Sequence, residues 1–161
     1  MNQKAKEKVM NLLENYQRNQ EQIALLHYEL KHPAELSLEE EIDVMNFGRG
    51  DGIGHSEGHI SNKTMYIALN FREKMAKENT DIITEISKKL VELEQERDRL
   101  HYYVSLLDKR QAEVIRLFYF KGHSWDEISQ ELGVALRTAH KIKAQAVERL
   151  VEMYSFMGAL R

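Results

Sequence analysis

The side chains best suited to bind a ligand lie in one helical stretch near the C-terminus. From about Ala135 to Met153 apolar residues recur at helical spacing and define one buried face, made of Ala139, Ile142, Ala146, Val147 and Leu150. At the start of this helix four residues point away from that face: Leu136, Arg137, His140 and Lys141. The planar fork of Arg137 can bond O6 and N7 of one guanine together, so the pattern suits base-pair edges in the DNA major groove.

Other polar groups nearby suit phosphates rather than bases. Lys141 lies one turn after Arg137 and can reach either a base or a phosphate. Thr138, Lys143 and the backbone N–H groups at Ser124 are predicted to bind phosphates, which would fix the register on DNA without reading its sequence. The candidate DNA-binding residues are therefore Ser124, Leu136, Arg137, Thr138, His140, Lys141 and Lys143.

Three short helices are predicted to position these residues. The first starts at a capping box of Asp108 and Gln111, ends near Gly122 and buries Val114, Ile115, Phe118 and, less centrally, Leu117. The second starts at a capping box of Ser124 and Glu127, ends at Gly133 and turns Trp125, Ile128 and Leu132 inward. With the final helix they form a trihelical helix-turn-helix unit.

The segment from Leu107 to Met153 resembles region 4 of sigma-70-type factors. The resemblance rests on an aromatic-rich helix end, a Gly-x-Ser-x-x-Glu-Ile run over 122–128 and a Glu-Leu-Gly-Val run over 131–134. It implies a helix-turn-helix that binds DNA. One departure is Ala135, because such helices usually start with Ser or Thr, whose side chain adds a cap of about 1 kcal/mol.

Two longer helices are predicted before this unit. From about Gln3 to His32 the apolar residues follow a seven-residue cycle, which ends before Pro33. A second heptad pattern runs from about Lys63 to Leu106, with the charged Arg97 at one position expected to be apolar. The two helices can form an antiparallel hairpin in one chain, a seam between two chains, or both, and periodicity does not choose between these.

The predicted organisation is thus a heptad helix over 1–32, a linking segment over 33–62, a coiled-coil-like helix over 63–106 and the helix-turn-helix domain over 107–161. The linking segment is expected to hold a short acidic helix over 38–45 and a flexible, glycine-rich, protease-sensitive loop over 46–62. The fold class is all-α: a long helical hairpin or coiled coil followed by a trihelical unit. This layout resembles the small ArpU/RinA-type regulators of Gram-positive phages and prophages, which implies control of phage genes, often late genes, through DNA binding.

Composition and motifs exclude several other classes of protein. The 161 residues contain no cysteine, which rules out disulfides, thiol nucleophiles and thiolate metal sites. No apolar run approaches the ~18 residues of a membrane span, so we expect a soluble protein in the cytoplasm of a bacterial host. No catalytic set or nucleotide loop is recognisable, so we expect no enzyme activity and no cofactor. His55 and His59 are four residues apart, but the glycines around them argue against a metal-binding helix.

The charge distribution places any contact with a polyanion at the C-terminal end. Residues 105–161 carry nine Lys or Arg against seven Asp or Glu, although the whole chain has a net charge of −3. We therefore expect a sequence-specific regulator that binds double-stranded DNA as a homodimer, or a higher homo-oligomer, through its heptad helices. RNA polymerase is a further candidate partner. Two alternatives are a small terminase-like DNA-packaging subunit and an adaptor that docks on polymerase or a sigma factor without reading DNA.

Overall fold

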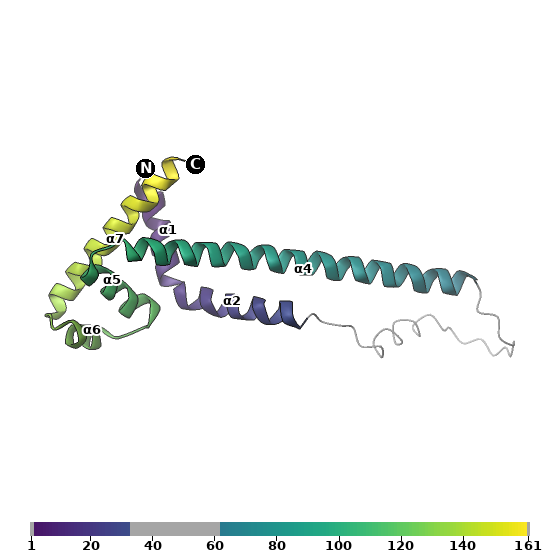
Figure 1. Ribbon diagram of the computed structural model, residues 1–161, viewed down its shortest axis with the longest axis horizontal. Coiled ribbons are helices and arrows are strands. Elements are labelled where there is room, and N and C mark those ends of the chain that lie inside the picture. The colour runs from purple at the N-terminus through teal and green to yellow at the C-terminus, as the bar shows by residue number, and fades with distance from the viewer. Residues whose placement is uncertain (1, 33–61, 161) are drawn as a thin grey trace. The chain divides into compact units, whose positions relative to one another are not determined.

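The computed structural model describes residues 2–32 and 62–160, and within these ranges all regular structure is helical, so the predicted all-α class is confirmed (Figure 1). The helical elements are α1 (Asn2–Glu14), α2 (Tyr16–Lys31), α4 (Asn62–Ser105), α5 (Lys109–Ile115), η1 (Arg116–Phe120), α6 (Trp125–Leu132) and α7 (Leu136–Ala159). None of the helices in the described ranges is long and apolar enough to cross a membrane. The acidic helix predicted over 38–45 and most of the loop predicted over 46–62 lie outside these ranges.

The chain divides into two compact units, one made of residues 1–25 and 90–161 and the other of residues 26–89. The first unit therefore joins the two ends of the sequence. This differs from the predicted boundary between residues 106 and 107, because the end of α4 and the whole of α1 share a core with the C-terminal helices.

The N-terminal heptad segment is divided into two helices rather than being one. A turn at Asn15 separates α1 from α2, and the Asn15 side chain donates a hydrogen bond to the Asn11 carbonyl at 3.0 Å. Asparagine competes for backbone groups in this way, which makes it a weak residue inside a helix. On the N-terminal side of this break, α1 packs against α7 near the two chain termini (Figure 1).

One large apolar core holds this unit together. Val9 and Leu13 of α1 are completely buried, as are Val104 of α4, Ile115 of α5 and Leu150 of α7. The same cluster includes Leu12, Leu100, Leu107, Ala112, Tyr119, Ala146, Val147, Val151 and Tyr154. The apolar stripe that predicts a coiled-coil seam in the sequence is thus used inside one chain, at least over α1 and the end of α4.

The long helix α4 matches its predicted range to within one residue at each end. Its heptad positions divide into two groups by burial. Leu90, Leu93, Leu100 and Val104 are buried, whereas Ile83 is 40 % exposed and Ile86 is half-buried. Within the described residues, the same pattern therefore continues beyond the buried part of α4.

A second, smaller core lies under the helix-turn-helix. Val114, Leu117, Ile128 and Ala139 are buried there, with Phe118, Trp125, Leu132, Val134 and Ile142 packed around them. The inward-facing residues expected from the spacing of α5, α6 and α7 all belong to one of the two cores.

The helix that starts at Lys109 departs from the prediction in its N-terminal cap and in the geometry of its last turn. Asp108 is the N-cap of this helix, but its side chain makes no capping hydrogen bond, so the predicted capping box with Gln111 is wrong. The first turn is closed instead by the backbone bond from the Ala112 N–H to the Asp108 carbonyl at 2.8 Å. At its other end the helix widens into the π-helical segment η1, where the Lys121 N–H bonds the Arg116 carbonyl at 2.9 Å. It ends before Gly122, which has φ +70°, as predicted.

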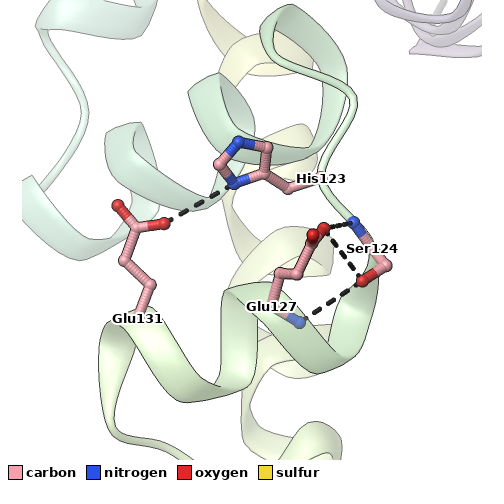
Figure 2. Close-up of polar contacts among 4 residues, drawn as sticks. All are labelled: His123, Ser124, Glu127 and Glu131. Atoms are coloured by element: carbon pink, nitrogen blue, oxygen red, sulfur yellow. Dashed lines mark hydrogen bonds and ion pairs between the residues drawn. The ribbon is translucent and has the colours of Figure 1, made fainter.

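The turn into α6 is held by the predicted capping box of Ser124 and Glu127 (Figure 2). The Ser124 N–H donates to the Glu127 carboxylate at 2.7 Å, and the Glu127 N–H donates to Ser124 Oγ at 3.4 Å. Two bonds donated to the Glu127 carboxylate lower its pKa: first the bond from the Ser124 backbone N–H, then the bond from the Ser124 hydroxyl at 3.0 Å. On the adjoining residue, His123 Nδ1 lies 3.5 Å from a Glu131 carboxylate oxygen. Gly133 ends α6 in the left-handed conformation at φ +62°, also as predicted.

An aromatic stack that the sequence analysis missed joins α2, α4 and η1. The Phe120 ring stacks on Tyr16 at 4.1 Å and on His101 at 4.8 Å between centroids, and Tyr16 Oη lies 2.8 Å from His101 Nε2. The Gln17 side chain also donates to the Phe120 carbonyl. Burial lowers the pKa of His101 and raises that of Tyr16. The three rings thus connect the N-terminal helices to the end of η1.

We predict that Leu13→Ala destabilises the helix-turn-helix as well as α1. Leu13 is only 1 % exposed, so truncation should cost about 2–5 kcal/mol. The single tryptophan, Trp125, belongs to the other core, and its fluorescence in urea would report the effect there. The matched control is Leu25→Ala, which is 64 % exposed and should change stability by at most about 0.5 kcal/mol. An unchanged Trp125 transition in Leu13→Ala would contradict a shared core.

We also predict a pH-dependent contribution of Glu127 to stability. Because its pKa is lowered on folding, the contribution is complete above the ordinary glutamate pKa of about 4.3 and is lost as pH falls through the lowered value. Glu127→Gln can keep a capping box without the charge, so its unfolding free energy should fall less between pH 5 and pH 3. Asp126→Asn, in the same first turn, is the control. If Asp126→Asn flattened the pH profile equally, the capping carboxylate would not be the cause.

Candidate nucleic-acid interface

The first two turns of α7 present the predicted base-reading residues to solvent. Leu136, Arg137, His140 and Lys141 are all exposed, as is Thr138, whereas Ala139 between them is completely buried in the smaller core. The turn before α7 is rigid, since the Val134 N–H bonds the Ser129 carbonyl at 3.1 Å and Ser129 Oγ bonds the Val134 carbonyl at 2.6 Å. The structure therefore brings these five side chains together on a fixed helix end.

His140 is exposed, but one of its ring faces is covered. The centres of the His140 and Trp125 rings lie 3.9 Å apart, and the Trp125 ring also stacks on Phe118 at 4.5 Å. The contact couples the start of α6 to α7. It also limits the orientations in which His140 can approach a base.

Lys143, which was predicted to bind a phosphate, lies against three aromatic rings. It is half-buried, and its ammonium lies 4.8 Å from the Phe118 ring centre, 5.4 Å from Trp125 and 5.6 Å from Tyr119. Aromatic faces attract a cation in this range. Its charge is thus held beside Trp125, the first residue of α6, instead of moving freely in water.

Ser124 is less available to a phosphate than we predicted. Its own N–H and hydroxyl both donate to the Glu127 carboxylate, at 2.7 Å and 3.0 Å. The carboxylates of Asp126 and Glu127 lie in the same first turn and would repel a phosphate there. The capping box therefore satisfies the helix end from within the chain, and phosphate binding at Ser124 stays a prediction.

The structure adds two residues that the sequence analysis overlooked. Lys109 and Arg110, at the start of α5, line an open groove with Thr138, Lys141 and Gln145 of α7. Positive charge at a helix start opposes the helix dipole, which favours acidic side chains there. That unfavourable placement, together with the Asp-Lys-Arg run over 108–110, is the signal that could have identified them.

The part of the chain that the structure describes contains no cluster of three or more histidine or acidic side chains able to hold a metal ion. His55 and His59 lie outside the described residues, so their proposed lack of metal binding is untested. The candidate interface is instead a surface of Arg, Lys and Thr side chains on α7, extended by the start of α5.

Comparison with known proteins supports this view of the C-terminal helices. The sequence model of the family described as Sigma-70, region 4 matches residues 97–150, about a third of the chain. The match includes the end of α4, α5, η1, α6 and most of α7. No curated protein and no solved structure gives a significant match. Residues 97–150 thus form a helix-turn-helix of the sigma-70 region 4 type.

Proposed function

We propose that this protein is a sequence-specific, DNA-binding transcriptional regulator of phage or prophage genes, acting in the bacterial cytoplasm. The observation that carries the proposal is the coincidence of the region 4 match with an exposed basic surface at the start of α7. Region 4 domains bind DNA, and in a helix-turn-helix the start of the second helix contacts base edges in the major groove. The phage assignment rests on the resemblance of the whole layout to ArpU/RinA-type regulators.

In this proposal α7 enters the major groove, where some residues contact base edges and others contact phosphates. Arg137 contacts a guanine through O6 and N7, with Lys141 beside it. Lys109, Arg110 and Thr138 contact phosphates on the α5 side of the groove, whereas Lys143 contacts phosphate on the α6 side. His140 contributes from a restricted position on Trp125.

The protein is also proposed to bind as a dimer through α4. Ile82 and Ile83 are exposed on this helix, and Ile83 continues the heptad seam beyond the buried Leu90. A second chain would cover that seam in a coiled coil. The two linked helix-turn-helix domains would then bind two half-sites of one DNA duplex more tightly than one domain alone, because binding of the first raises the effective concentration of the second.

We predict different losses for Arg137→Ala and Lys143→Ala in DNA selection from genomic fragments at about physiological salt. Arg137→Ala should remove the preference at one base pair, a loss of about 1–3 kcal/mol on the selected site. Lys143→Ala should weaken all duplexes alike and reduce the salt slope of binding by about 1. The control is Arg149→Ala, whose guanidinium pairs with Glu152 at 2.6 Å further along α7 and which should leave binding unchanged.

Uniform losses in both variants would contradict the base contact of Arg137. If the folded protein enriched no DNA but retained RNA polymerase or a sigma factor, the adaptor function would replace the proposed one.

We predict that Ile83→Glu converts a dimer into a monomer. Sedimentation should give about twice 18.9 kDa for the wild-type chain and 18.9 kDa for the variant, because a carboxylate on the seam cannot be buried against a second chain. The matched control is Thr84→Glu, an exposed residue next to the seam whose hydroxyl bonds the Thr80 carbonyl. A monomeric wild-type protein would overturn the dimer, and a large ring would favour the DNA-packaging alternative.

A further inference from the structure

One apolar side chain stands among the polar residues of the candidate interface. Leu136, the first residue of α7, is 44 % exposed and belongs to neither core, although Val134 and Ile142 on either side of it pack into the smaller one. On this surface Arg137, Thr138 and Lys141 are all polar and exposed. From this contrast we infer that Leu136 contacts the C5 methyl group of a thymine in the major groove, an inference that rests on the proposed function.

The backbone around Leu136 fixes where its side chain leaves the helix. Ala135 is extended, with φ −66° and ψ 149°, and supplies no side-chain cap, so nothing from the preceding residue covers the start of α7. The turn before it is held by Gly133 at φ +62° and by the two bonds between Ser129 and Val134. Leu136 and Arg137 are therefore both presented by the same hydrogen-bonded turn at the exposed start of α7.

The chemistry of leucine selects the base feature that it recognises. Its side chain has no hydrogen-bonding atom, so contact with an amino, keto or ring-nitrogen edge would desolvate that group without replacing its bond to water. The methyl group of thymine is the apolar feature that a base pair offers in the major groove. Because Arg137 is the adjacent residue, the thymine lies next to, or one step from, the guanine that Arg137 contacts.

The test uses the duplex that the wild-type protein enriches from genomic fragments. Each thymine in this duplex is replaced in turn by uracil, which keeps the base pair and removes only the methyl group. At one position in each half-site uracil should weaken binding roughly fourfold, the effect of losing the burial of one carbon group. In Leu136→Ala the same replacement should leave affinity unchanged, because the side chain that contacts the methyl group is absent.

The matched control is Leu160→Ala, an exposed leucine at the far end of the same helix region, which should retain the fourfold effect of uracil. Circular dichroism should show all three proteins equally folded, since both leucines lie on the surface. If no uracil replacement changed affinity, or if its effect persisted in Leu136→Ala, the methyl contact would be overturned while DNA binding stood. If no duplex were enriched at all, the proposed function and this inference would both fail.

Discussion

The burial of the apolar stripe of α1 against the C-terminal half of α7 is the interaction on which the rest of the structure depends. Without α1, the core that Val9 and Leu13 share with residues such as Leu150 and Val104 would be opened to water. At about 25 cal/mol per Å² of apolar surface, exposing several such side chains would remove much of the stability of a unit this size. The helix-turn-helix is therefore completed by a segment from the opposite end of the chain.

This arrangement gives α7 two roles along its length. Its 24 residues span about 36 Å, enough to pack on α1 at one end and to expose, at the other, the side chains proposed to bind DNA. The smaller core fixes the presenting end through Ala139, which is completely buried under α6 and η1. A rigid helix anchored in two cores can hold Arg137 and Lys141 at a constant spacing, which base recognition requires.

Local preferences for helix stability are broken at several residues of the surface proposed to bind DNA. Lys109 and Arg110 oppose the dipole of α5, Ala135 provides no cap for α7, and Leu136 is left in water. In contrast, α6 has a complete capping box and a left-handed glycine at its end. Departures from local preference concentrated on one surface are typical of a binding site, where the bound partner compensates for them.

The sequence by itself determined most of the local structure. Heptad spacing located α4 within one residue at each end, the Ser124–Glu127 pair and Gly133 set the limits of α6, and helical spacing separated Ala139 from the outward-facing Arg137 and Lys141. These features depend on residues a few positions apart, whose effects on the backbone are known.

The tertiary structure alone decided which surfaces pair. An apolar stripe indicates that a face is buried but not which partner covers it. Contacts between distant parts of the chain therefore decide how α1 attaches to α7 and where the helix breaks at Asn15. They also form the stack of Tyr16, His101 and Phe120 and the groove between Lys109 and Lys141.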